Sequence, residues 1–235
     1  MPQLRLDKIL ADSGAASRRE ARLMIKNGLV TVDGEVCREA DRKVDTETSR
    51  VCVEGKELRA GPRYFVMYKP LGVVTATEDR YERTVLDLLP PELRKLGLVP
   101  AGRLDKDTSG LLILTNDGAY LHQVISPRSK VYKTYLAAID RPLDGTEQAR
   151  FAGGIVLGDG TTCLPAELDP VDSLHCRVTV CEGKYHQVRR MFAACGRHVE
   201  TLHRESIGAL TLGRLMPGSV RELDRGEEQL VFKAR

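Results

Sequence analysis

The sequence has 235 residues, of which 42% are hydrophobic and 29% charged. No apolar run approaches the roughly 18 residues that a membrane span needs, and the first residues lack the apolar core of a secretion signal. We therefore expect a cytoplasmic protein that does not enter a membrane. At roughly 150 residues per domain the length favours two domains, which we place at residues 1–60 and 61–235. The net charge of +3 identifies no partner.

The six cysteines suggest reduced thiols. They are scattered through the chain, form no Cys-x-x-Cys pair and have no regular spacing to histidines. Disulfide-stabilised and zinc-binding domains show the opposite pattern. We therefore predict no metal site.

Two short helices are expected near the N-terminus. Leu6, Ile9 and Leu10 recur at helical spacing within residues 5–13, and Gly14 can end that helix. A second helix follows the capping box that begins at Ser17, ends at Gly28 and has a buried stripe of Ala21, Met24 and Ile25.

The second helix concentrates positive charge. Residues 1–30 hold six Lys or Arg against three acids. An ordinary solvated helix face is one explanation, and an RNA-binding face is the other. The cations predicted on its solvent side are Arg18, Arg19, Arg22 and Lys26.

The segment after these helices predicts small strands. Residues 29–36 contain an Asp-Gly hairpin turn between two apolar runs, and residues 51–53 supply another strand. With Leu6-Asp7-Lys8, Ser17-Arg18-Arg19-Glu20 and Val30-Thr31-Val32-Asp33-Gly34, residues 4–58 resemble the S-four family of RNA-binding domains. The resemblance implies that the four cations contact RNA phosphates, which supply affinity and not sequence choice.

The rest of the chain predicts an α+β domain: a mixed, mostly antiparallel sheet with flanking helices, following the small N-terminal α/β domain. Strands outnumber helices and show no βαβ alternation. After a linker at residues 59–63 and an irregular stretch at 78–97, strands are expected at 64–68, 111–114, 133–139, 154–157, 164–168 and 174–181, and helices at 119–125 and from 184 to Gly196.

A charged loop precedes the predicted strand at residues 111–114, and it places Asp105 on a fixed but reachable segment. Calcium binding is disfavoured because Asn116 stands where an EF-hand needs glutamate. An aspartic protease needs two such carboxylates, and the chain has one copy of the Asp107-Thr108-Ser109-Gly110 signature. A plain structural role, in which Asp105 pairs with Arg103 or Lys106, also fits the loop.

Five motifs in order resemble the RNA pseudouridine synthases, specifically the RsuA family. They are Lys69-Pro70-x-Gly72, Gly102-Arg103-Leu104-Asp105-x-Asp107-Thr108-x-Gly110, Lys133-Thr134-Tyr135-Leu136, Glu182-Gly183-Lys184-Tyr185-His186-Gln187-Val188-Arg189-Arg190 and Leu202-His203-Arg204. With the S-four-like segment, the resemblance covers nearly the whole chain.

The resemblance implies a set of site residues. Asp105 would be the catalytic aspartate, Tyr135 the active-site tyrosine and Arg189 the basic partner of the aspartate. Leu202 would pack under the base and Arg103 would fill the gap left by an extruded nucleotide. Lys69 and His186 complete the expected RNA-binding residues.

The implied reaction needs neither a cofactor nor a second carboxylate. Isomerising uridine moves the sugar from a ring nitrogen to a ring carbon without oxidation or group donation, in a closed pocket that excludes water. The carboxylate could attack the sugar, add to the base or remove a sugar proton, and a neighbouring Arg189 would keep it ionised. A uridine in folded RNA must first be flipped out.

We expect the substrate to be one uridine of small-subunit ribosomal RNA, met as an assembly intermediate by a monomeric enzyme. Large-subunit ribosomal RNA and a non-catalytic role in ribosome assembly are the alternatives. An RNA methyltransferase ranks last, because Gly153-Gly154 and Gly158-Asp159-Gly160 do not match a methyl-donor loop.

Overall fold

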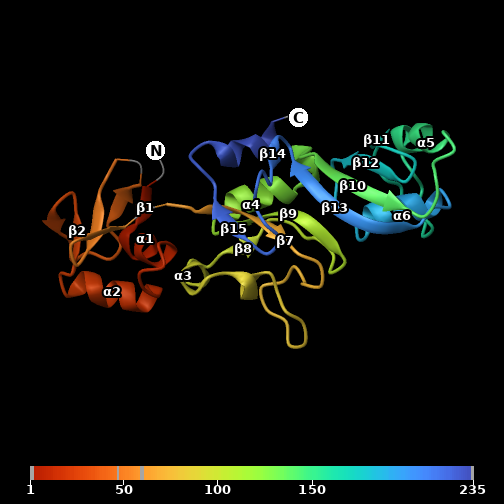
Figure 1. Cartoon of the computed structure of the whole chain (residues 1–235). Helices are drawn as coiled ribbons and strands as arrows, with labels where there is room; N and C mark the ends of the chain where they lie inside the picture. Colours follow the sequence, from red (N-terminus) through yellow and green to blue (C-terminus); the bar gives the residue numbers. More distant parts are fainter. Residues whose placement is uncertain (1–2, 47, 59–60, 234–235) are drawn as a thin grey trace. The chain divides into compact units, whose positions relative to one another are not determined.

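The computed structural model describes residues 3–46, 48–58 and 61–233 and divides the chain into two compact units (Figure 1). The first unit comprises Met1–Arg63 with Leu89–Val99 and Thr115–Asp117, and the second comprises Tyr64–Leu88, Pro100–Leu114 and Gly118–Arg235. None of the helices in the described ranges is long and apolar enough to cross a membrane.

The first unit contains two helices and short antiparallel strands. In chain order its N-terminal elements are β1 (Gln3–Arg5), α1 (Leu6–Asp12), α2 (Arg18–Lys26), β2 (Val30–Val32), β3 (Glu35–Val36), β4 (Lys43–Asp45), β5 (Val51–Val53) and β6 (Lys56–Leu58). Strand β1 pairs with β4, and the other four form a sheet in the order β3-β2-β5-β6. The later segment 89–99 adds the short helix α3 (Pro91–Arg94).

The capping box predicted for α2 is present. Ser17 Oγ accepts from the Glu20 amide and the Glu20 carboxylate accepts from the Ser17 amide, which satisfies amides left without partners at the helix start. Ala21 and Ile25 are buried against α1, but Met24 is only partly buried. The start of the chain differs from prediction, since residues 3–5 form a strand and α1 begins at Leu6.

A buried carboxylate organises the charges of α2. Asp7 has no exposed side-chain surface and lies 3.1 Å from Arg5, 3.0 Å from Arg22 and 3.9 Å from Arg18. Burial alone would raise the pKa of Asp7, but hydrogen bonds from Arg5 and Arg22 outweigh it and hold that pKa below its ordinary value. Two of the four predicted RNA-binding cations are thus tied to α1.

The second unit is built on a mixed, mostly antiparallel sheet, as predicted. Within the described residues its strands follow the order β11-β12-β10-β13-β9-β7-β15, with β14 beside β13 and β8 beside β9. The strands are β7 (Tyr64–Lys69), β8 (Val99–Pro100), β9 (Thr108–Thr115), β10 (Lys133–Ile139), β11 (Glu167–Pro170), β12 (His175–Val180), β13 (Val199–Ile207), β14 (Leu210–Thr211) and β15 (Val220–Glu222). Strand β13 pairs antiparallel with β10 and parallel with β9.

Helices pack on this sheet over two separate hydrophobic cores. Helices α5 (Glu147–Gly153) and α6 (Gln187–Ala194) pack on β10 and β12 through residues such as Phe151 and Phe192. Helix α4 (Gly118–Ile125) and the 3-10 segment η3 (Glu227–Phe232) pack on β7 and β9. Two further single turns, η1 (Leu86–Leu88) and η2 (Pro127–Ser129), lie in the connections.

The region from 142 to 172 differs most from prediction. The strand expected at 154–157 is wrong, since only an isolated bridge joins Val156 to Thr162 there, and the one expected at 164–168 begins three residues later, as β11 at Glu167. A helix, α5, precedes them instead. Its Phe151 ring lies 5.1 Å from that of Phe192, so α5 packs on α6. Residues 147–152 are mostly good helix formers, but the Gly, Pro and Asp residues around them favoured loops over the whole region.

Candidate active site

The loop that carries Asp105 is anchored on both sides of it. Leu104 is buried, donates its amide to Thr75 Oγ1 at 3.1 Å and accepts from the same hydroxyl at 2.7 Å. The carbonyl of Lys106 accepts from the Gly72 amide at 2.8 Å. The Asp105 carboxylate itself is 31% exposed. The loop is therefore fixed while its carboxylate stays reachable.

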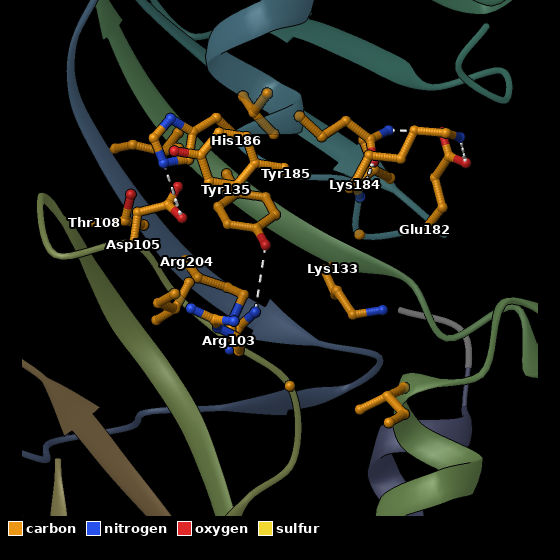
Figure 2. Close-up of a pocket in the computed structure, with 18 of the residues that line it drawn as sticks. Arg103, Asp105, Thr108, Lys133, Tyr135, Glu182, Lys184, Tyr185, His186 and Arg204 are labelled. Atoms are coloured by element: carbon orange, nitrogen blue, oxygen red, sulfur yellow. Dashed lines mark hydrogen bonds and ion pairs between the residues drawn. The ribbon is translucent and has the colours of Figure 1, made fainter. Parts of the chain in front are cut away.

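Asp105 faces a cavity of about 610 Å³, a volume typical of sites that enclose a small ligand or one nucleotide (Figure 2). The cavity lies entirely within the second unit. Its walls come from the Asp105 loop, from β10 and β13, and from the loop of residues 182–187. Four of the predicted site residues line it with Asp105, namely Arg103, Tyr135, His186 and Leu202.

His186 is the side chain that lies beside the Asp105 carboxylate. Its Nε2 lies 3.4 Å from Asp105 Oδ1, and its ring stacks on Tyr185 at 3.9 Å between centroids. The His186 backbone is left-handed, with φ at 47°, a conformation that side-chain-bearing residues rarely adopt. This backbone, directly before α6, turns the imidazole to the carboxylate.

Buried polar contacts hold the loop of residues 182–187 in shape. Gln187 Nε2 donates to Glu182 Oε1 at 2.8 Å, and Gln187 Oε1 accepts from the Lys184 amide at 2.9 Å. Glu182 also accepts from the Leu164 amide and pairs with the Lys184 ammonium. The position of His186 thus depends on a hydrogen-bond network in which the buried polar groups of Glu182 and Gln187 all have partners.

Arg189 does not occupy the position predicted for it. Its Nη2 lies 3.0 Å from Asp107 Oδ2 and its Nη1 donates to the Val199 carbonyl at 2.7 Å. It is not among the residues that line the cavity. The physical reason lies in the two strands. Asp107 directly precedes β9, and Val199 is the first residue of the neighbouring strand β13, so Arg189 links the beginnings of these two strands. A motif with two aspartates two residues apart does not say which one faces the arginine.

Tyr135 contacts a buried arginine that the prediction did not single out. Tyr135 Oη accepts from Arg204 Nη1 at 3.3 Å, and the guanidinium carbon lies 5.9 Å from the ring centroid. Arg204 is 2% exposed and donates its Nε proton to the Leu111 carbonyl. Strand alternation places Arg204 on the same face of β13 as Leu202, and that spacing could have identified it.

Lys69 supports the Asp105 loop from a buried position. It has no exposed surface, and its ammonium donates to the carbonyls of Pro70 and Thr108. Burial lowers its pKa to about 8, against the opposing influence of Asp105 and Asp107. The predicted RNA contact by Lys69 does not fit this position, because a buried ammonium on two carbonyls braces the Asp105 loop instead.

The cations predicted on α2 do gather on one surface. Arg18, Arg19, Arg22 and Lys26 border a surface hollow around the exposed Leu23.

In the described part of the chain no three His, Cys, Asp or Glu side chains come together in a way that could hold a metal ion, and the six cysteines are free thiols.

Comparison with known proteins decides the family. The profile of the RNA pseudouridylate synthase family matches residues 63–194, and that of the S-four domain matches residues 4–49. The chain belongs to the RNA pseudouridine synthases. It is therefore an RNA-modifying enzyme whose RNA-binding domain comes first in the sequence. The cavity that Asp105 faces lies within the matched synthase residues, apart from its β13 wall.

Relatives that match over nearly their whole length indicate the branch of the family to which the chain belongs. This synthase is 44% identical over 233 residues to the ribosomal small subunit pseudouridine synthase A of Vibrio cholerae, covering 98% of this chain and 100% of the relative. It is 40% identical to an uncharacterised RNA pseudouridine synthase of Bacillus subtilis, covering 97% and 98%. A crystal structure of a pseudouridylate synthase superposes with a TM-score of 0.69 at 35% identity, covering 97% and 99%. The resemblance to the RsuA family is confirmed.

Proposed function

We propose that this synthase converts a uridine of small-subunit ribosomal RNA to pseudouridine and that Asp105 is its catalytic carboxylate. The observation that carries the proposal is the position of Asp105: part exposed, on an anchored loop, in a nucleotide-sized cavity shared with Tyr135. The choice of RNA rests on the name of the Vibrio cholerae relative, which matches over its whole length.

The proposed chemistry uses side chains of this chain and no cofactor. The bond from sugar to ring nitrogen breaks, the base turns, and a ring carbon bonds to the sugar. The nitrogen takes up one proton and the ring carbon releases one, so nothing is oxidised or reduced. Asp105 acts as an ionised carboxylate, and a protonated His186 at 3.4 Å would offset its charge.

The cavity walls serve to keep the detached base in place. Tyr135 presents a ring face and Leu202 an aliphatic surface, and both lie within the same cavity as Asp105. A uridine held between these two surfaces would displace water, which could otherwise capture the sugar. Arg103, exposed at the cavity, is suited to fill the space that a flipped nucleotide leaves in the RNA.

Mapping pseudouridines tests the substrate. The purified protein is incubated separately with small-subunit and large-subunit ribosomal RNA, each as free transcript and as an assembly intermediate. We expect one modified uridine in small-subunit RNA, formed best in the intermediate. Modification confined to large-subunit RNA would contradict the proposed substrate and leave the enzyme class intact.

The N-terminal cations are proposed to bind RNA phosphates within a domain of residues 1–60. Arg19 and Lys26 test this better than Arg18 and Arg22, whose removal would also uncover the buried Asp7. Changing both Arg19→Gln and Lys26→Gln should weaken RNA binding. It should also reduce the slope of log affinity against log salt concentration by roughly 1.4–1.8, since each phosphate contact contributes about 0.7 on single strands and about 0.9 on B-form duplexes. Activity at saturating RNA should not change.

The matched control replaces two exposed lysines of the same unit, Lys43→Gln on β4 and Lys56→Gln on β6. This variant loses the same charge but should keep the salt dependence of the parent. Equal salt slopes for the two double variants would show that α2 is not the RNA-binding face.

A further inference from the structure

The charges that line the cavity do not balance. Glu182 is paired with Lys184, and Asp105 lies beside His186. Three further cations line the same cavity, and none of them has an acidic partner within the described residues: Arg103, Lys133 and Arg204. An enclosed site with surplus positive charge is suited to an anion.

Arg204 has a donor left over. Its guanidinium is buried and uses two nitrogens, one on the Leu111 carbonyl and one on Tyr135 Oη. The third nitrogen, Nη2, is buried without any hydrogen-bond partner. A buried charged donor without a partner is destabilising, so an acceptor brought to this guanidinium would be favoured.

Lys133 lies near that guanidinium on the neighbouring strand. It is two residues before Tyr135 on β10, so both side chains project from one face of the sheet. Its ammonium donates to the Val131 carbonyl at 2.9 Å. The pKa of Lys133 is lowered to about 8, mainly by burial and also by the charge of Arg204, while Cys181 opposes the shift.

The cations occupy one end of the cavity. Figure 2 shows Arg103, Arg204 and Lys133 on the hydroxyl side of Tyr135, whereas Asp105 and His186 lie beside the ring itself. A nucleotide whose base and sugar lie between Tyr135 and Asp105 would therefore extend its charged backbone toward the three cations. A neutral base carbonyl would leave their charge uncompensated, whereas a phosphate carries a full negative charge and several acceptor oxygens.

We propose that Arg204 and Lys133, together with Arg103 of the same cavity, bind a backbone phosphate adjoining the uridine that Asp105 isomerises. This inference rests on the proposed function and adds a positioning site to it. The phosphate contact fixes the sugar relative to Asp105, so it should act on substrate affinity more than on the bond-breaking step.

The test removes the charge from each side of the contact. A small-subunit ribosomal RNA fragment with the mapped uridine is prepared with a neutral methylphosphonate in place of each flanking phosphate in turn, and Kd, kcat and KM are measured. For the parent protein we expect one of the two substitutions to raise Kd and KM at least about tenfold, the effect of losing a charge-assisted contact. Lys133→Met should do the same with unmodified RNA.

Combining the Lys133 variant with the methylphosphonate RNA tests whether the two groups contact each other. If Lys133 contacts that phosphate, Lys133→Met should add little to the effect of the methylphosphonate, and Lys133→Arg should restore most of the affinity for unmodified RNA. The control Lys130→Met removes an exposed cation three residues away that does not line the cavity, and its effect should be independent of the methylphosphonate.

Two results would overturn the inference: no effect of a methylphosphonate at either flanking position, or fully additive losses from Lys133→Met and the methylphosphonate. An Asp105→Asn variant that still forms pseudouridine in the fragment would instead contradict the proposed function. The Kd values of the same cycle would then still decide the phosphate contact, so the two failures are distinguishable.

Discussion

Replacing Asp105 with asparagine should abolish pseudouridine formation and leave RNA affinity within about twofold. The amide has nearly the same shape but can neither attack the sugar nor accept a proton, and such a loss typically costs roughly 10²–10⁴-fold or more in rate. Because Asp105 lies on a loop anchored at Leu104 and Lys106, the backbone should keep its position. Single-turnover pseudouridine formation and a parallel binding titration measure the two effects.

Asp107→Asn is the matched control for that experiment. It makes the same change two residues away, on a carboxylate that is 63% exposed and pairs with Arg189 outside the cavity. The amide can still accept a hydrogen bond from Arg189, so we expect activity within a fewfold of the parent. Similar losses for both variants would mean that the loop as a whole, and not the Asp105 carboxylate, carries the effect.

Gly110→Ala should lower the free energy of unfolding by about 3 kcal/mol or more. Gly110 has φ at 116°, and a Cβ there would lie 2.3 Å from the Arg204 carbonyl oxygen on the paired strand. Backbone strain of roughly 1–3 kcal/mol adds to the cost of pushing apart β9 and β13, which is of similar size. Urea unfolding measures the change.

Gly118→Ala provides the comparison at a permissive glycine. Gly118 begins α4, and a Cβ there would meet nothing within 4 Å. Alanine is the better helix former, so stability should stay the same or rise slightly. A Gly110 variant as stable as the Gly118 variant would show that β9 and β13 can separate without cost.

Features specified by neighbouring residues could be predicted from the sequence. The capping box of Ser17 and Glu20 depends on a spacing of three residues, and it is present in α2. The apolar stripe of Val188, Met191 and Phe192 follows helical periodicity, and all three residues are buried in α6. The mostly antiparallel sheet followed from the excess of strands without βαβ alternation, and the alternation of apolar and polar residues over 174–181 predicted the strand that became β12.

Features that depend on distant residues could not be predicted in the same way. The position of helix α5 depends on the packing of Phe151 on Phe192, 41 positions later, and the Gly, Pro and Asp residues on both sides of the helix favour turns although residues 147–152 themselves are mostly good helix formers. The pairing of Arg189 with Asp107 depends on how β9 and β13 meet. The burial of Lys69 beneath the Asp105 loop likewise has no local signal, since its neighbours Pro70 and Gly72 indicate just a turn.

The buried Asp7 also affects how the protein would meet RNA. Long arginine side chains are usually free to rotate in solution, and holding one in place on binding costs about 0.5–1.5 kcal/mol of conformational entropy. Asp7 already restrains Arg22 and, more loosely, Arg18 in the unbound protein. Part of that entropy is therefore lost during folding, and α2 presents Arg22 and Arg18 in restrained positions, which suits an RNA backbone whose own shape is already fixed.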